Sequence, residues 1–200
     1  MSSKPQSRTE RVEYGKTLRN VVPRSQHAEW LSPPDRRDPI EILEESNHDR
    51  IPELIPFRYG RMLRSPFAFL RGSAALMASD HARLPHIGQH VQACGDCHLM
   101  NFGLFATPER NLVFDINDFD ETLRAPWEWD IKRLVTSFAI AGRDQGLSDA
   151  DCRDVATECL RAYRTHLREY SQMGPLEVWY ARLDADTIIK MSPDAEFRKR

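Results

Sequence analysis

Hydrophobic residues at helical spacing dominate the second half of the chain. Between residues 126 and 142, apolar side chains recur every three or four positions, at Trp127, Ile131, Leu134, Val135 and Phe138. This spacing places them on one face of a helix. Pro126 is expected in the first turn and Gly142 at the end. The pattern therefore predicts an amphipathic helix over this range.

A second helical pattern begins at Ser148. The hydroxyl of Ser148 can cap amides near Asp151, and apolar positions continue at the same spacing as far as Leu167. Cys152 and Cys159 lie on this apolar face, which predicts buried thiols. Shorter helical patterns cover residues 38–47, 49–63 and 73–84, and further helical pieces are expected between residues 175 and 200.

Strand patterns lie between these two groups of helices. Residues 101–105 and 111–116 alternate between apolar and polar positions around the turn TPER, which predicts a hairpin. Residues 90–93 alternate weakly and lead into a polar loop in front of the hairpin, and the segment SPFAFLRG (65–72) suggests extended structure. The fold class predicted from these patterns is α+β, mainly helical.

The start of the chain differs in composition. Seven of the thirteen prolines fall within the first 56 residues, and few apolar positions there are periodic. We therefore expect residues 1–39 to form a flexible N-terminal arm and residues 40–200 to form one domain.

Charge and hydropathy exclude several classes of protein. The 28 basic and 30 acidic residues leave a net charge of −2, which argues against a protein that coats nucleic acid. No segment approaches the ~20 apolar residues that cross a bilayer. The charged first residues, MSSKPQSRTERVEYGK, contain no apolar signal region, so a cytoplasmic location is expected. The sequence does not indicate the oligomeric state.

Acidic residues are concentrated between residues 94 and 130. This segment contains Asp96, Asp115, Asp118, Asp120, Glu121, Glu128 and Asp130 against only Arg110 and Arg124. Clustered carboxylates repel one another unless a cation or solvent offsets the repulsion, and Mg²⁺ binds one or two carboxylates together with phosphate oxygens. The alternative is a solvated hairpin end in which Asp118 or Asp120 caps a turn.

The segment GDCHLMN, followed by a hairpin and NDFDE, resembles the catalytic segment of aminoglycoside phosphotransferases and choline kinases. The resemblance implies that Asp96 orients the attacking hydroxyl, that Asn101 binds metal and that His98 shapes the catalytic loop. It also implies that Asp118 holds the metal, with Asp115 and Asp120 as the other candidates for contact with the metal nucleotide. Asp130 would accept hydrogen bonds from the backbone of the catalytic loop.

A second resemblance covers more of the chain. The segments IPELIPFRYGRMLRSPFAFLRGSAALMASD, CGDCHLMNFGLF, FDINDFDET and PWEWDIKRL are similar to a bacterial family known as domain of unknown function 2252, over about residues 50–182. Together, the two resemblances imply the catalytic lobe of a protein-kinase-like fold. Because the family is longer and carries a glycine-rich segment and a lysine-bearing strand further on, the chain is expected to be incomplete. Arg71 could contact phosphate in place of the lysine, or pair with one of the carboxylates.

The expected function is Mg²⁺-dependent transfer of the γ-phosphoryl group of ATP to a hydroxyl of an unknown substrate. The partners are then a nucleotide and a hydroxyl-bearing compound, with neither nucleic acid nor membrane. One alternative is a truncated or catalytically inert binding module with the same fold. A minor alternative rests on Cys94, Cys97 and His98, which spell C-x-x-C-H and indicate haem attachment, a zinc site or a redox dithiol.

Overall fold

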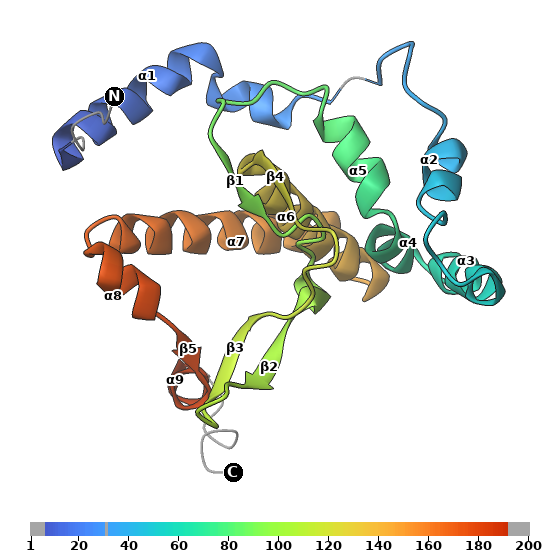
Figure 1. Ribbon diagram of the computed structural model, residues 1–200. Helices are drawn as coiled ribbons and strands as arrows, with labels where there is room; N and C mark the ends of the chain where they lie inside the picture. Colours follow the sequence, from blue (N-terminus) through green and yellow to red (C-terminus); the bar gives the residue numbers. More distant parts are fainter. Residues whose placement is uncertain (1–6, 31, 192–200) are drawn as a thin grey trace.

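The computed structural model describes residues 7–30 and 32–191 and has the predicted α+β, mainly helical class (Figure 1). The helices are α1 (Arg8–Val21), α2 (Pro39–Glu45), α3 (Ile55–Met62), α4 (Pro66–Gly72), α5 (Ala74–His81), α6 (Glu128–Asp144), α7 (Asp149–Tyr170), α8 (Pro175–Tyr180) and α9 (Ala185–Met191). The strands are β1 (His90–Ala93), β2 (Phe102–Ala106), β3 (Leu112–Ile116), β4 (Leu123–Pro126) and β5 (Leu183–Asp184). Short 3₁₀ turns occupy Arg24–Ala28 (η1), Pro52–Leu54 (η2) and Leu99–Asn101 (η3).

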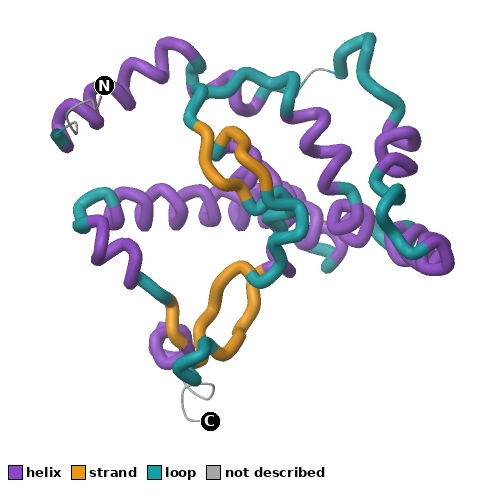
Figure 2. The backbone as a smooth tube through the Cα atoms, in the orientation of Figure 1, coloured by secondary structure: helices purple, strands orange, loops and turns teal. Residues whose placement is uncertain are grey.

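The strands form two small antiparallel sheets, one of two strands and one of three, which Figure 2 shows as two separate groups of orange segments. The predicted hairpin is confirmed: β2 pairs with β3 from Phe102 opposite Ile116 to Ala106 opposite Leu112. The weakly alternating segment before it is β1, which pairs with β4. The short strand β5 adds to the outer edge of β3, a pairing that the sequence did not predict.

Helices α6 and α7 pack against each other and confirm the two strongest sequence predictions. Ser148 caps α7 by accepting a hydrogen bond from the amide of Asp151. Cys152 is buried as expected, whereas Cys159 is only half-buried. Two boundaries of α6 were wrong: Pro126 belongs to β4, and the helix continues past Gly142 because the left-handed residue that ends the turn is Gly146.

The buried face of α6 is polar. Its buried residues are Glu128, Arg133 and Ser137, while the predicted apolar stripe is half-buried. A buried arginine requires a partner for its charge, so this face of α6 indicates where to look for a functional or structural polar site.

The prediction of an extended segment at residues 65–72 was wrong, since these residues form α4. The hydroxyl of Ser65 accepts a hydrogen bond from the amide of Ala68, 3.1 Å away, and Pro66 occupies the first turn. A cap followed by proline is a helix start, and it outweighs the apolar run that suggested a strand. Helices α2, α3 and α5 confirm the other helical patterns of the first half.

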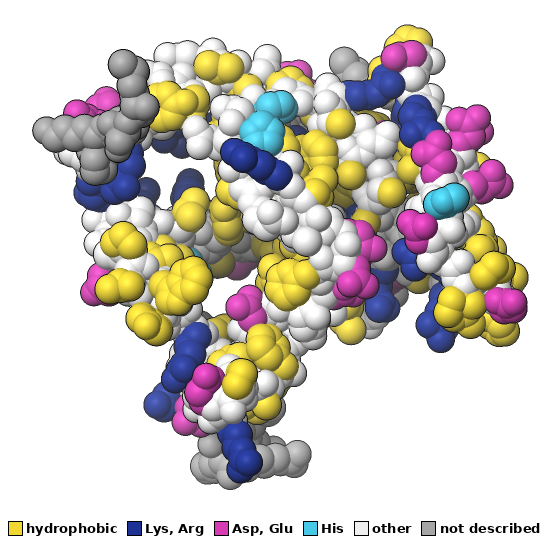
Figure 3. Space-filling view, viewed as in Figure 1, with side chains coloured by type: hydrophobic (Ala, Val, Ile, Leu, Met, Phe, Trp, Pro, Cys, Tyr) yellow, Lys and Arg dark blue, Asp and Glu magenta, His cyan; other side chains and the backbone are white. Residues whose placement is uncertain are grey.

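The segment expected to be an arm contains helix α1. Ser7 and Glu10 form a capping box at its start, yet none of its residues is buried. The proposed division into residues 1–39 and 40–200 stays a prediction. At the other end, α8 and α9 are the expected helical pieces, and residues 192–200 lie outside the described residues. Hydrophobic side chains of α8 are exposed, and they gather in the lower left of Figure 3.

Within the described ranges, no helix is both long and apolar enough to cross a membrane.

Candidate functional site

Asp96 lies in a sharp turn between β1 and η3. Gly95 has a φ of +82°, a left-handed conformation that glycine adopts without strain. A Cβ atom at this position would lie 2.0 Å from the carbonyl oxygen of Glu121. The loop that carries Asp96 is therefore pressed against the chain segment that follows β3, and only glycine fits between them.

Asp130, at the start of α6, bonds to the backbone of the loop that carries Asp96. Its two carboxylate oxygens accept hydrogen bonds from the amides of Cys94, at 2.7 Å, and Gly95, at 3.0 Å. Hydrogen bonds to a charged acceptor are stronger than those between neutral groups, and a carboxylate is favoured near a helix N-terminus. The contact is the one that the resemblance implied for Asp130.

The side chain of Asp96 is paired with a buried arginine. The Nε atom of Arg133 donates to Oδ1 of Asp96 over 2.6 Å, and its Nη2 atom donates to the carbonyl of Leu70 over 2.6 Å. Only 2% of the surface of Arg133 and 7% of that of Asp96 is exposed. Sequence reasoning missed Arg133, although its position three residues after Asp130 places both on one face of the helix.

The other carboxylate oxygen of Asp96 makes only a long contact. Its Oδ2 atom lies 3.5 Å from Nε2 of His98, which is longer than a normal hydrogen bond. Nδ1 of His98 accepts a hydrogen bond from the amide of Met100, and burial lowers the pKa of the imidazole, so His98 is neutral near pH 7. Oδ2 of Asp96 is therefore the oxygen best placed to meet a further group.

The side chain of Asn101 bonds back to the backbone of the same loop. Its Nδ2 atom donates to the carbonyl of Asp96 over 2.7 Å, and its own carbonyl accepts from the amide of Asn117 over 3.0 Å. The hydroxyl of Ser137, another residue that the sequence did not single out, accepts from the amide of Leu99. Buried and partly buried hydrogen bonds thus fix this loop.

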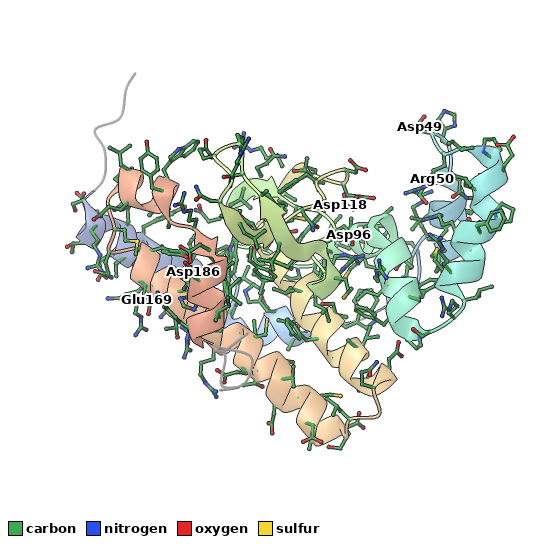
Figure 4. All side chains as sticks on the ribbon, turned by 90° about the horizontal axis from the view of Figure 1, so that it is seen from below. Asp49, Arg50, Asp96, Asp118, Glu169 and Asp186 are labelled. Carbon is green, nitrogen blue, oxygen red and sulfur yellow. The ribbon has the colours of Figure 1, made fainter. Side chains whose placement is uncertain are left out.

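Asp118, Asp120 and Glu121 form an acidic turn beside this loop. The thiol of Cys94 lies 3.5 Å from the backbone carbonyl of Asp118. The exposed side chain of Asp118 accepts a hydrogen bond from the amide of Asp120 at 3.4 Å. Burial raises the pKa of Glu121, and the charges of Asp96 and Asp118 raise it further. Figure 4 shows Asp96 and Asp118 on the same side of the strands. The acidic side chains of this turn therefore lie close enough to the loop for their charges to interact with Asp96.

Asp115 and Arg71 are the two remaining residues that the sequence analysis singled out. Asp115 stands opposite Gly103 in the hairpin, is exposed, and bonds to the amide of Ile116. Arg71 is exposed in the last turn of α4 and, in the described part of the chain, forms no ion pair. Its charge is nevertheless close enough to lower the pKa of His98.

Cys94 and Cys97 are buried free thiols on either side of Asp96. A hydrogen bond between the two side chains lowers the pKa of Cys94 and raises that of Cys97. Across residues 7–30 and 32–191, no three His, Cys, Asp or Glu side chains are grouped so as to hold a metal ion. A zinc site at C-x-x-C-H would thus need ligands from elsewhere.

Comparison with known proteins gives a family but no characterised relative. No curated protein and no solved structure matches the chain. The model of a family described as uncharacterized proteins conserved in bacteria (DUF2252) matches residues 50–200, which include the whole loop, the hairpin and α6. The chain therefore belongs to the DUF2252 family.

Proposed function

We propose that this chain is part of an Mg²⁺-dependent phosphotransferase that moves the γ-phosphoryl group of ATP to a hydroxyl of its substrate. The proposal includes the fold, a portion of a protein-kinase-like catalytic lobe, and a location in the bacterial cytoplasm. The observation that carries it is the loop around Asp96, which Asp130 holds through partly buried hydrogen bonds and Asn101 through a buried one.

A catalytic loop must present its carboxylate in a fixed position. Phosphoryl transfer depends mainly on positioning and electrostatic stabilisation. In this chain the backbone of Asp96 is fixed by Asn101, and Arg133 holds the Oδ1 atom. An acceptor hydroxyl would bind at Oδ2, which takes its proton as the hydroxyl oxygen bonds to the γ-phosphorus; the bond from that phosphorus to the β–γ bridging oxygen breaks, and ADP leaves.

The donor set near the loop fits Mg²⁺. This ion prefers oxygen ligands and is usually bound by one or two carboxylates together with substrate phosphates. A site of that kind does not require a group of three protein ligands, and none is present in the described residues. Asn101 and Asp118 would hold the ion, with Asp120 beside them. When bound, Mg²⁺ would neutralise the negative charge that develops on the phosphate oxygens.

The test is calorimetry of the intact chain with Mg²⁺ and ATP, followed by an assay for ADP release. Asp118→Asn should weaken Mg–ATP binding at least tenfold. Asp96→Asn should leave binding within about threefold while ADP release disappears, because the residue acts on the acceptor rather than on the nucleotide. Asp186→Asn, an exposed residue that Figure 4 shows away from Asp96, is the matched control and should change neither.

The second candidate is a binding module without turnover. One observation favours it: Arg133 already occupies Oδ1 of Asp96 in a buried ion pair, which is an arrangement that also serves structure alone. This candidate predicts Mg–ATP binding that depends on Asp118 but no ADP release from the unmodified chain. The absence of any Mg–ATP binding would contradict both candidates.

A further inference from the structure

Three arginines near the loop that carries Asp96 have no acidic partner. Arg50 lies in the loop after α2, Arg58 lies in α3, and Arg71 lies in the last turn of α4. Across residues 7–30 and 32–191, every arginine that forms an ion pair is a different one. A guanidinium group without an acidic partner retains its charge and its donors for an external anion.

Arg58 joins the segments on which these arginines lie. Its Nη1 atom donates to the side-chain oxygen of Asn47 at 2.7 Å. Its Nη2 atom donates to the hydroxyl of Ser46 at 3.1 Å and to the carbonyl of Gly72 at 2.7 Å. All three acceptors are neutral, so they satisfy hydrogen bonds without neutralising the charge. The half-buried guanidinium of Arg58 is therefore fixed at the end of α4, next to Arg71.

The end of α4 is also tied to the loop of Asp96. Nη2 of Arg133 donates to the carbonyl of Leu70, and Nε of the same side chain donates to Asp96. Arg71 follows Leu70 directly and is exposed. Burial lowers the pKa of His98, and the charge of Arg71 lowers it further. The charge of Arg71 therefore acts on the same loop.

Arg50 and Arg58 carry like charges close to each other. Burial lowers the pKa of Arg58, and the charge of Arg50 lowers it further, so the two guanidinium groups repel each other. Glu121 on the acidic turn attracts both arginines, yet no ion pair joins it to either one in the described part of the chain. Figure 4 shows Arg50 and Asp118 toward the same side of the molecule.

A phosphate group is the anion that suits this arrangement. The planar fork of arginine binds phosphate oxygens through two parallel hydrogen bonds, and a phosphate monoester carries a charge of about −1.5 to −2 near pH 7. Such a group would offset the repulsion between the arginines. A neutral or cationic ligand would leave all three positive charges uncompensated.

We propose that Arg50, Arg58 and Arg71 together bind a phosphate group of a substrate that meets Asp96. The inference deepens the proposed function and rests on it for the role of Asp96. The phosphate belongs either to an acceptor that carries both a phosphate and a hydroxyl, or to the nucleotide. The experiment distinguishes these two sources.

The test is calorimetry of the full chain at pH 7 in the absence of divalent cations, with two pairs of probes. Glycerol 3-phosphate is compared with glycerol, and ATP is compared with adenosine. In at least one pair, we expect the phosphorylated compound to bind about tenfold more tightly or better, because it gains charge-assisted hydrogen bonds. The pair that shows this preference identifies the source of the phosphate.

Three variants locate the site. Arg50→Gln and Arg71→Gln each remove an exposed charge, so each should weaken binding of the preferred phosphate compound about tenfold. Arg58→Gln should weaken it at least as much. Arg168→Gln is the matched control, because it removes an exposed charge from α7, and it should change nothing. Circular dichroism checks that each variant is folded.

Asp118→Asn separates this site from the proposed metal site. Because the probes are tested without metal, this variant should keep the preference for phosphate. A chain that shows the preference but fails to bind Mg–ATP would contradict the proposed function alone.

The proposal is overturned if neither phosphorylated probe is preferred over its neutral counterpart, even when Mg–ATP binds. It is also overturned if folded Arg50→Gln and Arg71→Gln variants keep the full preference, or if Arg168→Gln weakens binding as much as they do. If Arg58→Gln does not fold, the variants of the two exposed arginines decide the question.

Discussion

Helix α6 carries two buried polar regions that differ in how completely they are paired. Arg133 donates to Asp96, to the carbonyl of Leu70 and to the sulfur of Met77. One turn earlier, Glu128 accepts a single hydrogen bond from the amide of Ile87 and leaves its second oxygen without a partner. Among the residues that the structure describes, both nitrogens of His81, on the neighbouring helix, are also unpaired.

This difference in hydrogen bonding indicates that the two regions contribute to the fold in different ways. A charge that is buried must be paired, and the paired group then fixes the position of its partner, which is what Arg133 does for Asp96. The imidazole of His81 has no hydrogen-bond partner in the described part of the chain, and neither of its nitrogens is accessible. The fully bonded region therefore positions a loop, whereas the region around His81 is held by packing without hydrogen bonds.

The largest expected effect comes from Arg133→Met, which leaves the carboxylate of Asp96 buried without a charge partner. We expect a loss of about 3–5 kcal/mol in the free energy of unfolding, measured with urea. The control is Arg143→Met on the same helix, where the pair with Asp149 is exposed and the loss should stay below about 1 kcal/mol. Equal losses in both variants would contradict the distinction between the two kinds of pair.

The next effect is a dependence of stability on pH from His81. Its pKa is about 4 in the folded chain and near 6.5 when unfolded, so the unfolded state binds the proton more tightly. The contribution is complete above pH 6.5 and is lost as the pH falls toward 4, by roughly 3 kcal/mol at most. Burial lowers the pKa of His27 and His98 as well, so they act in the same direction.

The share of His81 is isolated by comparing the unmodified chain with His81→Leu. Urea unfolding at pH 7, 6, 5 and 4 should show a shallower decline for the variant. Parallel curves would mean that His81 takes up no proton on unfolding in this interval.

A smaller effect is expected where the loop touches the acidic turn. Gly95→Ala places a Cβ against the carbonyl of Glu121 and strains a left-handed residue, which should cost roughly 2 kcal/mol in unfolding free energy. Gly146→Ala has a similar φ of +79° but open space around the new methyl group. It should cost about half as much, and a reversed order would show that the close contact near Glu121 is absent.

The smallest expected change in unfolding free energy is that of Arg71→Ala. This variant tests stability and nucleotide binding separately. Because its side chain is exposed, Arg71→Ala should change the unfolding free energy by less than about 0.5 kcal/mol. If Arg71 contacts phosphate in place of a lysine, its removal should nevertheless weaken Mg–ATP binding several-fold in calorimetry. Unchanged binding would mean that Arg71 does not contact the phosphates of ATP and that its charge acts on other groups of the site, such as His98.

The regular elements were predictable where the pattern was long. The apolar repeats of α6 and α7 extend over several turns, so both helices follow from spacing alone. Helix α4 has only seven residues, too few for its period to be distinguished from a strand. The two-residue strand β5 reaches β3 across a long stretch of chain, and no local signal encodes that pairing.

The candidate site was predictable in part for a different reason. Motif spacing indicated Asp96, Asn101 and Asp130, and the structure joins their side chains and backbone in one loop. Arg133 escaped notice because sequence patterns place charged residues on the surface by default. Its importance arises from tertiary burial, which neither residue type nor spacing reveals.

The most direct test of the central claim asks whether a metal nucleotide lies beside Asn101. Mn²⁺ replaces Mg²⁺ in the presence of ATP, and the side-chain amide resonances of asparagines are followed by NMR. We predict selective broadening of the Asn101 resonance, weaker broadening of Asn111 at the far end of the hairpin, and loss of the effect in Asp118→Asn. An Asn101 resonance that stays sharp with Mn²⁺ and ATP would contradict the proposed site.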